Sequence, residues 1–111
     1  MESITTQYKH CDLVKVSGRV DSSTAPRFAE ELTRITGSRH FKIVIDFSEV
    51  QFLSSAGLRV LITTQKNCKR YNRGEVVLAA VPANILAVFD LAGFTTIFKI
   101  YDSVTSAVGA F

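Results

Sequence analysis

The sequence predicts an α/β fold with a mostly parallel central sheet, and two observations carry this prediction. Strand-like and helix-like segments alternate along the 111 residues, without a Pro-rich, Gly-rich or Ser-rich linker between them. Segment 41–47 (FKIVIDF) is short and almost continuously apolar, which is typical of a central strand covered on both faces. We therefore expect one domain spanning residues 1–111, with about five strands, an antiparallel N-terminal edge strand, right-handed crossovers and about four helices.

The N-terminal part is predicted to form a β-hairpin followed by a helix. Segments 3–9 (SITTQYK) and 11–20 (CDLVKVSGRV) carry strand-like alternation and β-branched residues, so we expect them to pair. Helix signals follow, with Pro26 in the first turn and Gly37 as a stop. The candidates for the N-cap are Ser22, Ser23 and Thr24, and the expected apolar face consists of Ala25, Phe28, Leu32 and Ile35.

Helices and strands continue to alternate after the central strand. The expected elements are a helix from Ser55 to about Asn72, a strand at 75–81, a helix at 82–93, a strand at 94–101 and a helix from about Ser103 to Ala110. Each of the first two of these helices is expected to have an apolar inward face. Their inward residues are expected to be Leu58, Leu61, Ile62 and Cys68 in one, and Ile85, Leu86 and Phe89 in the other.

The charge pattern gives only weak support for nucleic-acid binding. The formal net charge is +3, and the one dense basic stretch is 66–73 (KNCKRYNR). Its cations, at Lys66, Lys69, Arg70 and Arg73, recur at helical spacing near a predicted helix C-terminus, where positive charge is favourable. A solvated helix end is the preferred interpretation, and an acidic protein partner or nucleic acid are the alternatives.

Several classes of protein are not expected. No apolar run reaches the roughly 18 residues of a membrane span, and the first residues lack the features of a signal peptide, so we expect a cytoplasmic protein without a membrane partner. Cys11 and Cys68 have no CxxC spacing, and neither His10 nor His40 has metal-ligand spacing with another ligand. Phosphate-binding glycine motifs and a catalytic triad pattern are also missing, so we expect neither enzymatic activity nor a cofactor.

The residues that could carry chemistry lie at 49–61 (EVQFLSSAGLRVL), where a strand and a turn lead into the second helix. Ser54 and Ser55 stand at the helix start, where free N–H groups and the helix dipole favour a negative charge. One serine could simply cap the helix, and Gly57 could simply allow close packing of helix against strand. Alternatively, a hydroxyl at this place is well suited to phosphorylation, because the helix start can accommodate the phosphate.

The segment 45–61 (IDFSEVQFLSSAGLRVL) resembles the signature of the STAS-domain anti-sigma factor antagonists. The resemblance extends upstream to 18–26 (GRVDSSTAP) and downstream to 74–94 (GEVVLAAVPANILAVFDLAGF), so it covers nearly the whole chain. It implies a STAS-type fold for residues 1–111. It also implies that the chain works by binding another protein and is not an enzyme.

The resemblance implies specific functional residues. The family's phosphorylated serine stands two positions before the glycine of the helix-opening motif, which makes Ser55 the expected site and Ser54 the less favoured one. Many members have Asp before this serine and Ser after it, where this chain has Ser54 and Ala56. Asp21 matches an acidic residue near the family's partner surface, although it could also be a helix cap. The residues expected to bind the partner are Asp21, Ser54, Ser55, Ala56, Gly57 and Leu58.

Other residues near the junction have less defined expectations. Asp46 and Glu49, which we place on the strand and turn leading to the site, could contribute polar contacts or only solubilise its rim. Phe52, Leu53, Leu58 and Val60 bracket the serines, and most should belong to the core. One or two of these four could be exposed and provide an apolar anchor for a partner.

The resemblance implies a partner-switching cycle. The unphosphorylated protein binds an anti-sigma factor that is also a serine kinase, and this binding releases a sigma factor. The kinase phosphorylates Ser55 with ATP, the complex dissociates, and a PPM-type serine phosphatase restores the binding form. A monomer or weak dimer is expected. The alternatives are a STAS regulatory domain that binds a nucleotide or another small ligand, and a switch of the same kind without a sigma factor.

Overall fold

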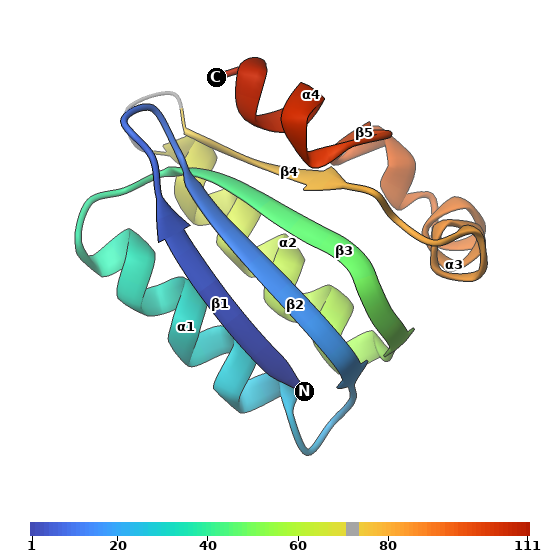
Figure 1. Ribbon diagram of the computed structural model, residues 1–111. Coiled ribbons are helices and arrows are strands. Elements are labelled where there is room, and N and C mark those ends of the chain that lie inside the picture. The colour runs from blue at the N-terminus through green and yellow to red at the C-terminus, as the bar shows by residue number, and fades with distance from the viewer. Residues whose placement is uncertain (71–73) are drawn as a thin grey trace.

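The structure, a computed structural model, describes residues 1–70 and 74–111. Its elements follow the predicted alternation of strands and helices (Figure 1). In order they are β1 (Glu2–Gln7), β2 (Asp12–Val20), α1 (Ala25–Gly37), β3 (Lys42–Leu53), α2 (Ser55–Arg70), β4 (Glu75–Ala79), α3 (Ala83–Ala92), the 3-10 turn η1 (Phe94–Thr96), β5 (Lys99–Tyr101) and α4 (Val104–Gly109). The α/β fold class is therefore confirmed. The predicted end of the second helix near Asn72, and Arg73 of the basic stretch, lie outside the described residues.

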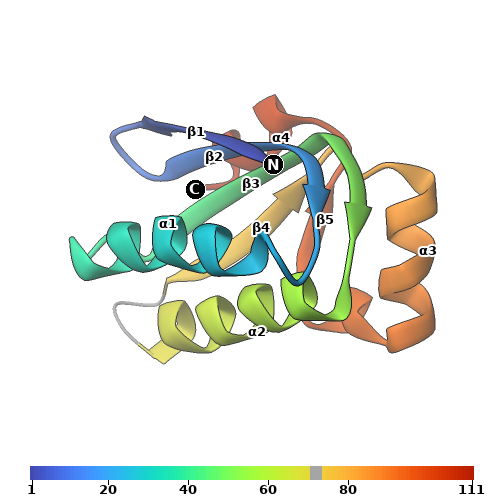
Figure 2. The same cartoon turned by 90° about the horizontal axis from the view of Figure 1, so that it is seen from below.

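The five strands form one sheet in the order β1-β2-β3-β4-β5. β1 is the antiparallel edge strand, and all the other neighbours are parallel. α1 and α2 cover one face of the sheet and α4 lies on the other, while α3 stands beside the ends of the strands (Figure 2). The carboxyl ends of β2 and β3 lie side by side, because Val20 pairs with Leu53. This pairing positions the start of α2.

Most of the predicted core is confirmed. The apolar face of α1 is fully buried, and so are Leu58, Leu61 and Cys68 on α2. These side chains join the inner face of β2, β3 and β4 in one large cluster, while a smaller cluster around Val44, Val77 and Ala107 lies under α4. The central segment Ile43–Phe47 is buried throughout. The sheet is therefore covered on both faces at β3, as its apolar sequence predicted.

Several strand boundaries differ from the predictions, and those of β3 and β5 differ most. β3 does not end at Phe47 but runs on to Leu53. Asp46 therefore lies on the strand as expected, whereas Glu49 lies within the strand and not on a turn. The extension pairs with the end of β2 through two register shifts, which the sequence pattern does not reveal. The last strand was predicted at 94–101 but spans only Lys99–Tyr101. Gly93 adopts a left-handed conformation that closes α3, and residues 94–96 then form the 3-10 turn.

A buried glutamine ties α2 to the C-terminal part of the sheet. The Gln65 side chain is 3% exposed, and its Oε1 accepts a hydrogen bond from the backbone N–H of Val76 at 2.6 Å. Its Nε2 donates to the carbonyls of Val76 at 3.1 Å and Ile97 at 3.0 Å. This one side chain therefore fixes the helix against β4 and against the segment that leads into β5.

Candidate functional site

The two serines at the start of α2 have different structural roles. The backbone N–H of Ser54 donates to the Val20 carbonyl at 2.8 Å, which ties the helix start to the end of β2. The Ser54 hydroxyl accepts from the Gly57 N–H at 3.3 Å, and the Ser54 carbonyl accepts from the Leu58 N–H at 3.0 Å. Ser54 is therefore the N-cap of α2.

Ser55 is the first residue of α2, and it is exposed to solvent. Among the described residues, no hydrogen bond engages its hydroxyl. The amide groups of the first helical turn are the ones that lack partners within the helix, and they point toward the same end as this residue. Of the two neighbouring serines, Ser54 thus caps the helix, and Ser55 carries the accessible hydroxyl.

Gly57 allows α2 to start very close to the sheet. A β-carbon at this position would lie 2.6 Å from Leu53 Cδ1 and 2.9 Å from Val20 Cγ1. Both distances are far below normal contact, so any side chain here would push the first turn of α2 away from the strand ends. The close packing expected for this glycine is confirmed.

Asp21 lies at the end of β2, directly after the residue that binds Ser54. Its Oδ1 accepts hydrogen bonds from the Ser23 hydroxyl at 2.6 Å, the Ser23 N–H at 3.0 Å and the Thr24 N–H at 3.1 Å. These bonds, the one from the Ser23 hydroxyl foremost, lower the pKa of the Asp21 carboxyl. Arg19 Nε lies 4.0 Å from Oδ2. The carboxylate thus orders the loop into α1, whose N-cap position is Thr24.

The other two acidic candidates are engaged elsewhere. Asp46 is buried and accepts a hydrogen bond from the backbone N–H of Ser48 at 2.9 Å. Glu49 forms an exposed ion pair with Lys15 at 3.6 Å. Neither contact involves the serines at the start of α2. The structure therefore places Asp21 directly after Val20, whose carbonyl binds the Ser54 N–H, but it does not bring Asp46 or Glu49 to the serines.

Phe52 is the exposed member of the four apolar residues around the serines. Its side chain is 39% exposed, whereas Leu53 and Leu58 are buried and Val60 is half-buried. The Arg19 guanidinium lies 4.3 Å from the centre of the Phe52 ring, which is a cation–π contact. Phe52 is therefore the available apolar anchor that the sequence could not identify.

An exposed apolar surface on α3 was missed by the sequence interpretation. Leu91 is 91% exposed and Val88 is 39% exposed, although Ile85 and Phe89 on the other side of the helix are buried. α3 stands at the same end of the sheet as the start of α2 (Figures 1 and 2). The signal was present in the sequence, because ANILAVFDLA is apolar on both sides of a helix and not on one.

The cysteines and the basic residues singled out from the sequence lie away from the start of α2. Both cysteines are buried and free, and burial raises their pKa, that of Cys68 to about 11. Within 1–70 and 74–111, no three His, Cys, Asp or Glu side chains come together as a metal site. Lys66, Lys69 and Arg70 are exposed near the end of α2, as the solvated-face interpretation predicted. No helix in the described part of the chain is both long and apolar enough to cross a bilayer.

Comparison with known proteins identifies the fold. A family model described as the STAS domain matches residues 3–107. The chain belongs to the STAS domain family. The anti-sigma-B factor antagonist of Listeria monocytogenes is 30% identical over 91 residues, which cover 82% of this chain and 78% of that protein. BtrV of Bordetella bronchiseptica, provisionally named as an anti-sigma factor antagonist, is 31% identical over 96 residues, 86% of this chain and 82% of BtrV.

Solved STAS structures agree with these sequence matches. A crystal structure of an anti-sigma factor antagonist from Mycobacterium paratuberculosis superimposes with a TM-score of 0.88 at 26% identity, covering 98% of this chain and 92% of that one. Unphosphorylated SpoIIAA, also an anti-sigma factor antagonist, has a TM-score of 0.85 at 12% identity, with coverages of 98% and 95%, and this likeness concerns the fold alone. The chain is thus a STAS protein of the anti-sigma factor antagonist group, whose members are regulatory binding proteins and not enzymes.

Proposed function

We propose that this STAS protein, in its unphosphorylated form, binds an anti-sigma factor that is a serine kinase, and that phosphorylation of Ser55 ends this binding. A PPM-type serine phosphatase then restores the binding form. The observation that supports the proposal most directly is the division of roles between the two serines. Ser54 is occupied as the N-cap of α2, while the Ser55 hydroxyl is exposed and free to enter a kinase active site.

The start of α2 can accommodate a phosphate on Ser55. The first turn holds no acidic residue, and its N–H groups and dipole favour a dianion. Arg59 follows one helical turn after Ser55 and is exposed, so its guanidinium is placed to compensate part of the added charge. The domain should therefore keep its stability when Ser55 is phosphorylated.

The same phosphate would be unfavourable in a complex. Phe52 is the apolar anchor nearest to the serines in sequence, and Val88 and Leu91 of α3 extend the apolar surface at this end. A charge of about −1.5 to −2 placed in such an interface costs several kcal/mol through desolvation. A hundredfold to thousandfold loss of affinity requires only about 3 to 4 kcal/mol. One phosphate is therefore sufficient to switch the complex off.

The site is tested by incubating the protein with its candidate kinase and ATP, followed by mass spectrometry of the labelled peptide. Ser55→Ala should abolish labelling. Ser54→Ala is the matched control, since it removes the neighbouring hydroxyl, and it should lose about 1 kcal/mol of stability with its cap but remain labelled at Ser55. Labelling of Ser55→Ala at the wild-type level would contradict the assignment.

The switch itself is tested by calorimetric titration of the kinase with phosphorylated and unphosphorylated protein. We expect affinity to fall at least about a hundredfold while the melting temperature changes little. Phe52→Ala should weaken binding of the unphosphorylated form without unfolding the domain. Parallel losses of affinity and of melting temperature on phosphorylation would show that the phosphate acts by unfolding and not at an interface.

A further inference from the structure

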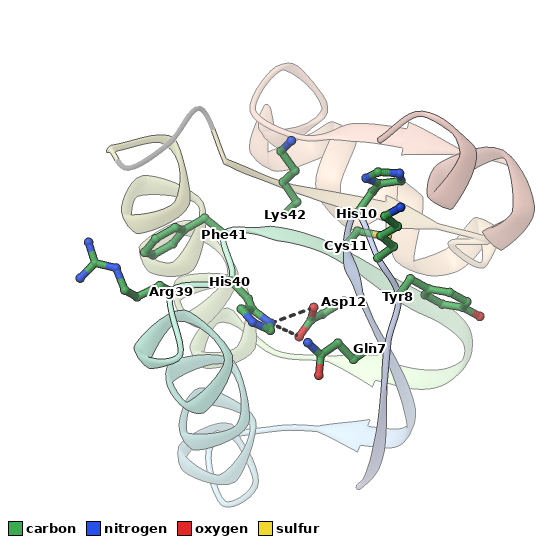
Figure 3. Close-up of a pocket in the computed structure, with 10 residues that line it drawn as sticks. Gln7, Tyr8, His10, Cys11, Asp12, Arg39, His40, Phe41 and Lys42 are labelled. Atoms are coloured by element: carbon green, nitrogen blue, oxygen red, sulfur yellow. Dashed lines mark hydrogen bonds and ion pairs between the residues drawn. The ribbon is translucent and has the colours of Figure 1, made fainter.

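A hollow lies at the ends of β2 and β3 that are opposite to Ser55. It has a volume of about 330 Å³, within the range of small-molecule sites. One wall is the turn between β1 and β2, residues 7–12, and the other is the connection from α1 to β3, residues 39–42 (Figure 3). These two segments are far apart in sequence and meet only in the folded sheet.

Three of the ten side chains that line this hollow, those of Lys9, Arg39 and Lys42, are cationic. Lys9 comes from the first wall and Lys42 from the second. Arg39 lies at the rim with its side chain pointing outward (Figure 3). Within the described residues, Lys9, Arg39 and Lys42 have no carboxylate partner. The cations that do lie within 4.0 Å of a carboxylate are elsewhere, at Lys15, Arg19, Arg34 and Lys99. In the part of the chain that the structure describes, no ion pair therefore neutralises the three cations of this hollow.

The one carboxylate in the hollow already has a partner. Asp12 is 6% exposed, and its two oxygens lie 3.1 Å and 3.2 Å from Nδ1 of His40. The pair joins the two walls, since Asp12 begins β2 and His40 precedes β3. By formal charge, Lys9, Arg39 and Lys42 outnumber this one carboxylate, so the lining of the hollow keeps an excess of positive charge.

Arg39 occupies a backbone conformation that normally favours glycine. Its φ is 65°, and its N–H donates to the Thr36 carbonyl at 2.9 Å in the turn that ends α1. The predicted stop, Gly37, precedes it by two residues and does not have a positive φ. An arginine held in a strained position adds a cation to a rim that is already positive, and such outliers often mark functional sites.

We propose that this hollow binds a small multivalent oxyanion carrying phosphate or carboxylate groups. Lys9 and Lys42 supply mobile positive charges from opposite walls, and such lysines are suited to phosphate as point charges. Gln7, which also lines the hollow, offers its side-chain amide as a neutral donor. The proposal is independent of the function proposed for Ser55, because the hollow shares no residue with that site.

The probes are pyrophosphate and citrate, titrated separately into ¹⁵N-labelled protein at an ionic strength of about 10 mM, where screening is weak. We expect saturable shifts of the amides in 7–12 and 39–42. Lys9→Ala combined with Lys42→Ala should weaken binding about tenfold. Arg27→Ala combined with Lys66→Ala is the matched control, since it removes the same charge from exposed helix positions, and it should change affinity less than about twofold.

The outcomes distinguish an oxyanion site from general charge effects and from an acidic protein partner. Binding of pyrophosphate alone identifies a phosphate site and binding of citrate alone a carboxylate site, and either supports the proposal if the control variant binds normally. Equal losses of affinity in the two double variants, or amide shifts spread over the whole surface, would mean that the anions respond only to the general positive charge of the protein. Either result would overturn the proposal. A polyglutamate peptide that binds where neither small anion does would also overturn it, in favour of an acidic protein partner. Ser55→Ala should bind pyrophosphate like wild type. Failure of the oxyanion proposal would therefore not affect the proposal that a kinase phosphorylates Ser55.

Discussion

Adding one methyl group at two glycines should have opposite effects on stability, and this tests how α2 is seated on the sheet. At Gly57 the new carbon would overlap Leu53 Cδ1 at 2.6 Å and Val20 Cγ1 at 2.9 Å. Overpacking of this kind costs about 1 to 3 kcal/mol, and the better helix propensity of alanine returns at most about 1 kcal/mol. Since two carbons overlap at under 3.0 Å, the cost should lie in the upper part of this range, and Gly57→Ala should lower the free energy of unfolding by about 1 to 2 kcal/mol.

Gly37→Ala provides the control, because the same chemical change meets open space. No heavy atom lies within 4 Å of the position that its β-carbon would take, and its φ is not in the left-handed region. Reduced freedom of the unfolded chain should then stabilise the protein by about 0.4 to 1 kcal/mol. Urea unfolding measures both changes in stability. The unfolding midpoint of Gly57→Ala should fall by roughly 1 M, and that of Gly37→Ala should rise. Wild-type stability of Gly57→Ala would refute the close packing of helix against strand.

Three further predictions concern groups with distinct environments. Gln65→Leu should cost about 2 to 4 kcal/mol in urea unfolding, because it leaves the buried backbone groups of Val76 and Ile97 unpaired. The pKa of Asp21 is lowered, so its carboxylate stabilises the fold above the ordinary value of 3.8 and this contribution is lost as pH falls through the folded pKa. The stability difference between wild type and Asp21→Asn should accordingly shrink in urea titrations below about pH 3.8. Cys68, with its pKa raised to about 11, should resist alkylation at neutral pH until the protein unfolds, as mass spectrometry can follow.

Features that depend on local periodicity could be predicted from the sequence. The inward face of α1 repeats at helical spacing, and FKIVIDF is apolar throughout, so burial of Phe28 and Ile45 follows from pattern alone. The serines at the start of α2 could also be located, because a strand followed by Ser-Ser-Ala-Gly marks a helix start. What the sequence could not decide was which serine is the cap. That depends on the orientation of the first turn, which the Ser54 N–H to Val20 carbonyl bond determines.

Features that depend on tertiary contact could not be predicted. The extension of β3 past Phe47 exists because its backbone pairs with β2, although its own residues alternate irregularly between polar and apolar. Gln65 carries no mark of burial in the sequence, since a polar residue on a helix is normally solvated. The cationic hollow joins Lys9 and Lys42 from separate turns, so only the sheet register brings them together.

The capping role of Ser54 also bears on how this chain differs from other proteins of its family. Many members have Asp before the phosphorylated serine, and Asp and Ser are about equally good N-caps, so the exchange preserves the start of α2. It does remove a full negative charge from the residue next to Ser55. A phosphate dianion there meets the N–H groups of the first turn and Arg59 without an adjacent carboxylate opposing it. If Ser55 is phosphorylated as proposed, its phosphate should meet less electrostatic repulsion than in a relative with Asp, and the proposed loss of partner binding would have to come from the interface itself.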